Sequence, residues 1–334
     1  MVATHNFTVF RGDNTGKIQR GTTEKRLEAD EVLIRVTHSG LCGTDCHFRS
    51  SGIVLGHEGI GTVEACGENA KKYTKGDVVG WGYIHETCGS CHNCLSGREV
   101  YCATPKIFGN HAVDQGSLST QAIWKEAYIF AIPSALNPAN AAPLMCAGAT
   151  VFSPLYEHGV NGTHTVGIVG IGGLGHLAIQ FAAKMGCRVV VFSSTEDKRD
   201  EAMKLGANEF YATKGKTHLD VEHPLDFLLV TTSFIPSWKM YFDTMAKGGT
   251  VVALTVAQGD ITIPYENILQ KGLKLMGSSV ASRWVHKLML EFAARHNIQA
   301  QIEEFPMTEE GITEAFDKLD AGKLRYRAVL KNEM

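Results

Sequence analysis

The sequence predicts an α/β protein in which a strand–helix domain is inserted into a β-rich domain. Between about residues 150 and 280, short β-branched runs alternate with helical stretches, a pattern typical of βαβ units and a parallel sheet. Residues 1–146 instead contain short strands and Gly-rich breaks, and mixed elements return after residue 282. The length of 334 residues suits about two domains. We therefore expect segments 1–150, 151–282 and 283–334, with the first and the last in one domain.

Individual strands and helices follow from local patterns of apolar residues. Glu31–Thr37 alternates apolar and polar side chains, as a half-buried strand does. In the first domain we also expect strands at Gly59–Ala65 and Asp77–Gly80. The second domain should contain four strands, Thr165–Val169, Arg188–Phe192, Asp226–Thr231 and Thr250–Leu254, and three helices, Leu174–Met185, Asp197–Leu205 and Ser237–Met245. The final segment predicts a helix at Trp284–His296 and a strand at Tyr326–Lys331.

Composition and charge indicate a globular protein and argue against a nucleic-acid-binding or membrane-spanning one. An apolar content of 44% and a charged content of 20% are ordinary for a globular protein. The net charge of −3 gives no general attraction for nucleic acid or for an anionic membrane. The most apolar run, 165–185, contains His176, Gln180 and Lys184, so it is a poor membrane span. The N-terminal region lacks the pattern of a signal peptide, so we expect a cytoplasmic protein whose nine cysteines bind metal rather than form disulfides.

A Gly-rich segment after the first predicted strand of the second domain indicates a dinucleotide site. Gly170, Gly172 and Gly175 fit the G-x-G-x-x-G pattern. Gly170 would allow the tight turn, Gly172 would let the backbone approach a pyrophosphate, and Gly175 would let helix and strand pack closely. Gly173 and Leu174 complete the turn, and the helix N-terminus offers its N–H groups to the phosphates. The strand before it and the helix after it favour this interpretation over an ordinary Gly-rich turn.

The end of the second strand in this domain favours NADP(H) over NAD. An acidic residue there would bind the ribose of NAD, but the sequence has Ser193-Ser-Thr-Glu-Asp-Lys-Arg. Ser193 and Ser194 can donate hydrogen bonds to a 2′-phosphate, and Lys198 or Arg199 can supply positive charge. The alternative is a polar loop whose acidic residues interact with the start of a helix.

Four closely spaced cysteines predict a structural zinc site in a lobe at about residues 85–105. Cys88, Cys91, Cys94 and Cys102 form the pattern C-x2-C-x2-C-x7-C. Four thiolates complete a tetrahedral zinc shell and leave no open position, which is typical of a structural site. A redox C-x-x-C motif would explain only two of these cysteines.

A second, dispersed set of residues suits a catalytic zinc ion. Cys42, His57 and Cys146 would supply two thiolates and one imidazole and leave one position for water or substrate. Spacing alone does not distinguish these residues from isolated packing residues. With the lobe, this set makes two zinc ions per chain.

Several motifs together resemble the zinc-dependent medium-chain alcohol dehydrogenases. The motifs are Cys42-Gly-Thr-Asp-Cys-His, Gly56-His57-Glu58-Gly, the four-cysteine lobe, Cys146-Ala-Gly-Ala-Thr and Gly170-Ile-Gly-Gly-Leu-Gly. Residues 142–155 and 191–199 most resemble the cinnamyl-alcohol-dehydrogenase branch. The resemblance implies a GroES-like catalytic domain, an inserted Rossmann domain with a doubly wound parallel sheet, reversible alcohol–aldehyde oxidoreduction, and a homodimer.

The resemblance also assigns roles to single residues. It implies that Cys42, His57 and Cys146 bind the catalytic zinc, that Glu58 lies beside the metal, and that Asp45 orients the liganding imidazole. It places Thr44 and His47 in a proton relay, Thr150 near the nicotinamide and Arg327 near the pyrophosphate. The segment Phe48–Leu55 is short for the family, and Trp81 and Leu118 lie in a region that usually shapes the pocket.

The reaction we expect is hydride transfer between NADP(H) and a small alcohol/aldehyde pair, with an apolar or aromatic aldehyde favoured. One alternative is an NAD-dependent polyol or amino-acid dehydrogenase, and another is a reductase of an activated carbon–carbon double bond. A non-catalytic zinc- and nucleotide-binding redox sensor would leave Cys42, His57 and Cys146 and the relay of Thr44 and His47 unexplained.

Overall fold

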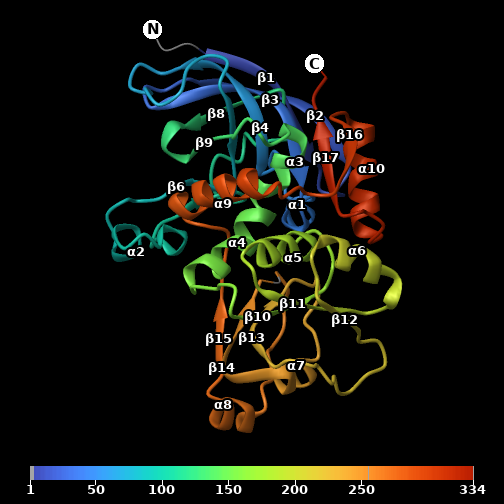
Figure 1. Cartoon of the computed structure of the whole chain (residues 1–334). Helices are drawn as coiled ribbons and strands as arrows, with labels where there is room; N and C mark the ends of the chain where they lie inside the picture. Colours follow the sequence, from blue (N-terminus) through green and yellow to red (C-terminus); the bar gives the residue numbers. More distant parts are fainter. Residues whose placement is uncertain (1–3, 255, 334) are drawn as a thin grey trace. The chain divides into compact units, whose positions relative to one another are not determined.

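The computed structural model describes residues 4–254 and 256–333, which form two compact units (Figure 1). The chain up to Cys146 and the chain from Ser282 onward make unit 1, and Ala147–Ala281 makes unit 2. These limits differ by a few residues from the segments expected above. Helix α4 (Ala147–Glu157) belongs to unit 2 because it packs on α5 (Gly175–Lys184), where the rings of Phe152 and Phe181 lie 5.3 Å apart.

A seven-stranded sheet forms the centre of unit 1. Its order is β16 (Ile302–Pro306), β17 (Arg327–Lys331), β3 (Glu31–Leu41), β4 (Glu58–Cys66), β5 (Val78–Trp81) and β9 (Phe130–Ala131), and β8 (Gln121–Lys125) also pairs with β3. The C-terminal β17 runs antiparallel to β3, with Ala328 opposite Leu41. The four strands predicted for this unit are therefore confirmed, and the pairing of β17 with β3 joins the C-terminal segment to the sheet of the N-terminal segment.

The other elements of unit 1 surround this sheet. β1 (Thr4–Gly12) and β2 (Ile18–Arg26) form an antiparallel pair, and β6 (Ile84–Glu86) and β7 (Lys106–Ile107) form the neck of the cysteine lobe. The α-helices are α1 (Gly43–Phe48), α2 (His92–Leu95), α3 (Pro138–Ala141), α9 (Arg283–His296) and α10 (Glu309–Asp320). Short 3-10 helices lie at η1 (Glu99–Tyr101), η2 (Glu126–Tyr128) and η3 (Ala142–Met145). The helix predicted at Trp284–His296 is confirmed as α9.

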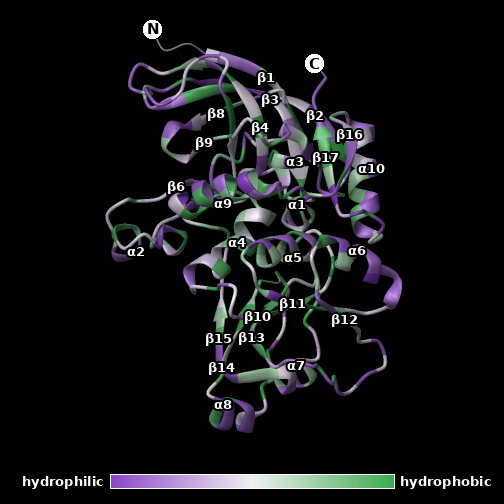
Figure 2. Cartoon of the chain, in the orientation of Figure 1, coloured by the Kyte–Doolittle hydropathy of each residue, from purple (hydrophilic) through white to green (hydrophobic). Residues whose placement is uncertain are grey.

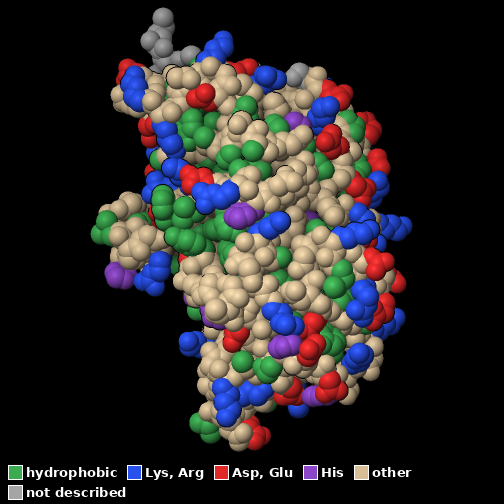
Figure 3. Space-filling view, viewed as in Figure 1, with side chains coloured by type: hydrophobic (Ala, Val, Ile, Leu, Met, Phe, Trp, Pro, Cys, Tyr) green, Lys and Arg blue, Asp and Glu red, His purple; other side chains and the backbone are tan. Residues whose placement is uncertain are grey.

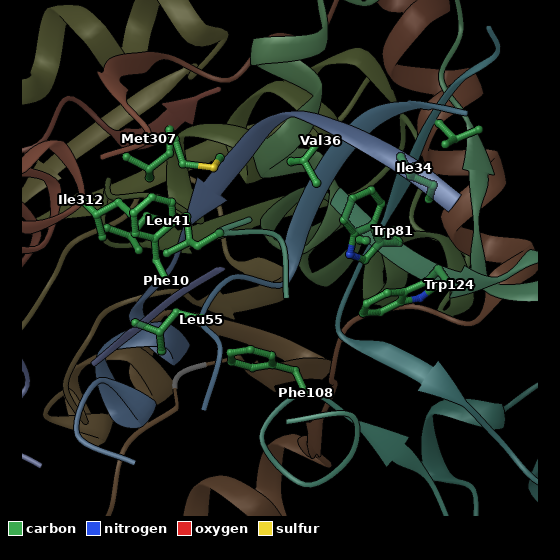
Figure 4. Close-up of a cluster of buried hydrophobic side chains, with 14 of the residues drawn as sticks. Phe10, Ile34, Val36, Leu41, Leu55, Trp81, Phe108, Trp124, Met307 and Ile312 are labelled. Atoms are coloured by element: carbon green, nitrogen blue, oxygen red, sulfur yellow. The ribbon is translucent and has the colours of Figure 1, made fainter. Parts of the chain in front are cut away.

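The core of unit 1 shows that two expected pocket residues are packing residues. Trp81 and Leu118 have no exposed surface. Trp81 points inward with Trp124, whose ring centre is 5.5 Å away (Figure 4). A Cβ atom at Gly59 would lie 2.2 Å from the Trp81 indole, so the glycine makes room for this side chain. The expectation that Trp81 and Leu118 shape a pocket is wrong, because fully buried side chains of the core have no surface left for a substrate.

Unit 2 is a doubly wound α/β domain. Its six strands are parallel in the order β12 (Glu209–Ala212), β11 (Arg188–Ser193), β10 (Thr165–Val169), β13 (Leu225–Val230), β14 (Met245–Ala253) and β15 (Lys274–Gly277). The chain runs outward from β10 in one direction and then, from β13, in the other, so the order reverses beside β10. Besides α4 and α5, the helices are α6 (Arg199–Leu205), α7 (Trp238–Thr244) and α8 (Tyr265–Lys271), with the 3-10 turn η4 (Glu196–Lys198) before α6.

The distribution of charged side chains on the surface agrees with the near-neutral net charge of the sequence (Figure 3). Helices α9 and α10 contain many hydrophilic residues, whereas the central strands of unit 2 are hydrophobic (Figure 2). On the face shown in Figure 3, basic and acidic side chains are interspersed. Within residues 4–254 and 256–333, each helix is too short or too polar to cross a lipid bilayer.

Candidate active site

Helix α1 starts at Cys42 and brings the first candidate ligand into place. The Cys42 sulfur caps the helix by accepting the N–H of Thr44 at 3.4 Å. The Cys42 N–H in turn donates to Asp45 Oδ2 at 3.0 Å, which completes a capping box. The cysteine is thus held by the end of a helix rather than by a flexible loop.

Asp45 joins the segments that carry two candidate ligands. Its carboxylate is fully buried and accepts the Gly56 N–H at 2.9 Å, besides the Cys42 N–H. His57 Nδ1 lies 3.3 Å from Asp45 Oδ1, which leaves Nε2 for another partner. Gly56 adopts a φ of +91°, and a Cβ there would lie 2.6 Å from the Leu118 backbone nitrogen, so this turn requires glycine. The orienting role that the resemblance implies for Asp45 suits this geometry.

Glu58 and Arg327 form a buried ion pair beside the same set. The guanidinium of Arg327, on β17, donates to Glu58 Oε1 at the start of β4. Burial raises the pKa of the Glu58 carboxyl to about 7, although Arg327 opposes this rise. A Cβ at Gly40 would lie 1.9 Å from Glu58 Oε2, so this glycine makes room for the carboxylate. Arg327, expected near a pyrophosphate, thus has a direct role inside unit 1.

The residues of the dispersed set come together and suit a zinc ion. One ligand atom from each of Cys42, His57, Glu58 and Cys146 lies within 4.8 Å of the others. His57 Nε2 and Glu58 Oε2 are buried and have no hydrogen-bond partner among the described residues. A hydrogen bond from Cys146 lowers the pKa of Cys42, so one thiolate forms readily. Sulfur and imidazole nitrogen are the ligands that zinc prefers, and the unpartnered Nε2 gives the imidazole a free lone pair.

The four lobe cysteines also have the geometry of a zinc shell. Their sulfur atoms lie 3.5–3.9 Å apart for the pairs Cys91–Cys94, Cys88–Cys102 and Cys88–Cys94. Zinc–sulfur bonds of about 2.3 Å in a tetrahedron place sulfur atoms about 3.8 Å apart. Backbone N–H groups of the loop lower the pKa of Cys88 to about 6, which favours its thiolate. All nine cysteines of the chain are free thiols.

An aromatic wall beside His57 was not anticipated from the sequence. The His57 ring lies 4.8 Å from that of Phe108 and 5.9 Å from that of Tyr83, and Phe48 meets Phe108 edge to face at 5.3 Å. Phe108 is buried, whereas Tyr83 and Phe48 keep part of their surface exposed. Thr44 is half-buried on the first turn of α1, and His47, three residues later, is exposed.

The Gly-rich turn in unit 2 has the shape of a phosphate-binding loop. Gly170 has a φ of +93°, and a Cβ at Gly175 would lie 1.9 Å from the Gly170 carbonyl oxygen, so both positions require glycine. A Cβ at Gly172 would meet no protein atom within 4 Å, so the space in front of it is open. Gly173 and Leu174 lead into α5, whose N-terminus follows the turn.

The loop after β11 brings a positive charge to this turn. Ser193 ends the strand half-buried, and Ser194 follows it exposed. Lys198 Nζ donates to the carbonyl oxygen of Ile171, inside the Gly-rich turn, at 2.7 Å. Arg199 instead pairs with Glu196 at 2.6 Å. Thr150 is buried on α4, in the same unit as these residues.

Comparison with known proteins identifies both parts of the chain. Residues 28–134 match the family described as alcohol dehydrogenase GroES-like domain, and residues 173–295 match the zinc-binding dehydrogenase family. A probable cinnamyl alcohol dehydrogenase, 8D, of Oryza sativa subsp. japonica is 33% identical over 98% of this chain and 95% of the relative. The aldehyde reductase AdhA of Synechocystis sp. is 34% identical over 92% of each chain.

Solved structures agree with these sequence matches. A cinnamyl alcohol dehydrogenase from Sorghum bicolor matches with a TM-score of 0.92 and 29% identity, over 98% of each chain. A cinnamyl alcohol dehydrogenase from Helicobacter pylori, solved in complex with NADP(H), shares the fold with a TM-score of 0.89 over 99% of each chain, at 24% identity. The chain therefore belongs to the zinc-dependent alcohol dehydrogenases of the cinnamyl alcohol dehydrogenase type, and it is an oxidoreductase of alcohols and aldehydes.

Proposed function

We propose that Cys42, His57 and Cys146 hold the catalytic zinc ion and that Cys88, Cys91, Cys94 and Cys102 hold a structural one. The observation that carries the catalytic assignment is His57, which is fully buried, contacts Asp45 through Nδ1 and has no partner at Nε2 among the described residues. When bound, the catalytic zinc polarises a substrate oxygen and NADPH supplies a hydride. Glu58 lies close enough to take part in ligation, but its pairing with Arg327 favours the three-residue set at rest.

Residues of α1 orient the His57 imidazole and transfer a proton between the substrate and solvent. Asp45 fixes the tautomer of His57 by accepting its Nδ1–H, so that Nε2 keeps its lone pair. The Thr44 hydroxyl, two residues after Cys42, passes a proton to or from the substrate oxygen. His47 is exposed three residues later and exchanges that proton with solvent.

The cofactor that we propose is NADP(H). No carboxylate stands at the end of β11, where Ser193 and Ser194 can donate hydrogen bonds to a 2′-phosphate. Lys198 adds a positive charge at the Gly-rich turn, where it already binds the Ile171 carbonyl. Gly170, Gly172, Gly173, Leu174 and Gly175 would hold the pyrophosphate, and Thr150 would contact the nicotinamide.

The substrate that we propose is an apolar or aromatic aldehyde and its alcohol. Tyr83 and Phe48 present partly exposed rings in the cluster that surrounds His57, and such rings favour planar apolar substrates. The names of the relatives, cinnamyl alcohol dehydrogenase and aldehyde reductase, agree with this class.

We also propose a cytoplasmic homodimer. Strand β15 forms an edge of the sheet in unit 2, and Leu275 on it is partly exposed. Tyr265 and Leu269 on α8, which packs on β14, expose most of their surface. An edge strand beside exposed apolar side chains suits pairing with a second copy. The free thiols suit a reducing compartment.

A substrate and cofactor panel tests this proposal most broadly. Aldehydes, alcohols, polyols and an α,β-unsaturated aldehyde are assayed with NADPH and NADH, with product analysis and zinc content measured on the same protein. We expect reduction of aromatic aldehydes to alcohols, higher kcat/KM with NADPH, and two zinc ions per chain. A preference for polyols with NAD, a saturated carbonyl product, or one zinc ion without turnover would each overturn it in favour of a different function.

A further inference from the structure

A small cavity lies at the neck of the cysteine lobe, apart from both candidate zinc sites. Its walls come from β6, from the turn after β7, and from β8, and its volume is about 40 Å³. The walls include His85, His111, Glu31, Glu86, Gln115 and Trp124. One ordered water needs about 10–15 Å³ of such space, so the cavity has room for an ion with a small number of waters.

His85 is a buried imidazole with neither nitrogen satisfied. Its exposed fraction is 6%, and neither Nδ1 nor Nε2 has a hydrogen-bond partner among the described residues. Unpartnered buried polar atoms are uncommon in folded proteins, because each costs free energy unless something binds it. Burial also lowers the pKa of His85 to about 3, so the imidazole is neutral at pH 7 and its lone pair is available to a metal.

His111 lies at a distance that allows both imidazoles to share one ion. The ring centres of His85 and His111 are 5.9 Å apart, with an angle of 72° between the rings. With metal–nitrogen bonds of about 2.0–2.1 Å, two imidazoles on one ion have ring centres about 5–6 Å apart. His111 is half-exposed, so an ion could enter from solvent on its side.

The charged side chains around the cavity nearly balance one another. Glu86 is neutralised by Lys106 at 2.7 Å and by Lys125 at 3.4 Å. Lys125 also pairs with Asp30, and Lys25 pairs with Asp114. Glu31 has no ion pair among the described residues, but its carboxylate accepts the Glu28 N–H at 3.0 Å, and burial raises the pKa of its carboxyl. These groups comprise four carboxylates and three lysines, which leaves one negative charge in excess.

We propose that His85 and His111 bind a divalent transition-metal ion in this cavity, as a third metal site of the chain, with Glu31 as the compensating carboxylate. Imidazole ligands suit Zn²⁺, Ni²⁺ and Cu²⁺, and water molecules in the cavity would complete the coordination shell. The ion would join β6 to the turn at residue 111 and so brace the neck of the cysteine lobe. This site is independent of the residues assigned to catalysis and cofactor binding above.

Nickel titration of the zinc-loaded enzyme tests the proposal, with Trp124 as a reporter. The Trp124 ring lies 4.3 Å from that of His85, so a bound paramagnetic Ni²⁺ should quench its emission. We expect one Ni²⁺ per chain by equilibrium dialysis, zinc content unchanged, and a saturable quench that is smaller in Trp124→Phe while Ni²⁺ binding persists. His111→Ala should weaken Ni²⁺ binding by about tenfold or more and leave aldehyde reduction unchanged.

A matched control uses a histidine elsewhere on the surface. His218 is exposed and lies 2.9 Å from Asp220, so His218→Ala removes an imidazole beside a carboxylate without touching the cavity. It should bind Ni²⁺ as the wild type does. Absence of Ni²⁺ uptake beyond zinc exchange, or equal affinity in wild type and His111→Ala, would overturn the proposal and leave water as the occupant of the cavity.

Discussion

Replacement of Asp45 by Asn tests whether this carboxylate holds the catalytic metal set together. Asp45 accepts the N–H groups of Cys42 at 3.0 Å and Gly56 at 2.9 Å and lies 3.3 Å from His57 Nδ1. Asn has nearly the same shape but keeps only one acceptor oxygen and places an amide donor against one of these N–H groups. Leaving a buried donor unsatisfied costs about 1–3 kcal/mol, and removal of a group that orients a metal ligand lowers metal affinity by about 10–100-fold.

The assay is competition for zinc with a chromophoric chelator, read together with kcat/KM for aldehyde reduction. In Asp45→Asn, the chelator should remove one zinc ion at about 10–100-fold lower concentration than in the wild type, and activity should disappear with that ion. Asp77→Asn is the matched control, because Asp77 accepts the Thr74 N–H at 2.8 Å in an exposed turn. Coinciding chelator curves for Asp45→Asn and the wild type would show that Asp45 does not hold the metal set together.

Three further substitutions probe the cofactor loop and a buried histidine. Lys198→Met removes the positive charge at the Gly-rich turn, and loss of a charge-assisted bond of about 1.5–3 kcal/mol to the 2′-phosphate should raise the Kd for NADPH about tenfold or more, with Lys204→Met on the following helix α6 as the unchanged control. Gly175→Ala places a Cβ against the Gly170 carbonyl and should cost about 1–3 kcal/mol in the free energy of unfolding; an unchanged melting curve would contradict this. Burial lowers the pKa of His286 to about 3, below an unfolded value of about 6.5, so its contribution to stability is complete above pH ~6.5 and decreases by about 1.4 kcal/mol per pH unit toward pH 3. His286→Phe, which keeps the stack on Phe130, should flatten that acid limb in urea titrations, and a limb as steep as in the wild type would refute the assignment.

The sequence was sufficient to predict the α/β unit because its signals are local. The strand at Thr165–Val169 is confirmed at its predicted limits, since a central strand of a parallel sheet is buried on both faces and is a continuous apolar run. The helix after the Gly-rich turn also agrees, as α5. Polar elements were harder to predict from the sequence. Strand β2 (Ile18–Arg26) is mostly polar, and it forms because β1 pairs with it along its whole length. The helix α10 was not predicted, although Thr308 caps it and its apolar residues recur on one face.

Within the candidate site, residues in short motifs could be predicted, but contacts across the chain could not. The metal set was anticipated because the motifs around Cys42, His57 and Cys146 are specific to the family. The contact of Arg327 with Glu58 joins residues 269 apart in the sequence, and it depends on the pairing of β17 with β3. The ring of Tyr83 beside His57 had a possible signal, since it follows Gly82 directly before the cysteine lobe. Trp81, two residues before Tyr83, instead points into the core and is fully buried.

Turnover by the Cys42→Ala variant, at NADPH concentrations shown to saturate it, tests the central claim most directly. Cys42 caps α1 and contributes one sulfur to the set with His57 and Cys146, whereas the residues proposed to bind NADPH lie in unit 2. We expect measurable NADPH binding, loss of one zinc ion per chain and no detectable reduction of an aromatic aldehyde. Full activity in a Cys42→Ala protein that has lost this zinc ion would contradict this claim.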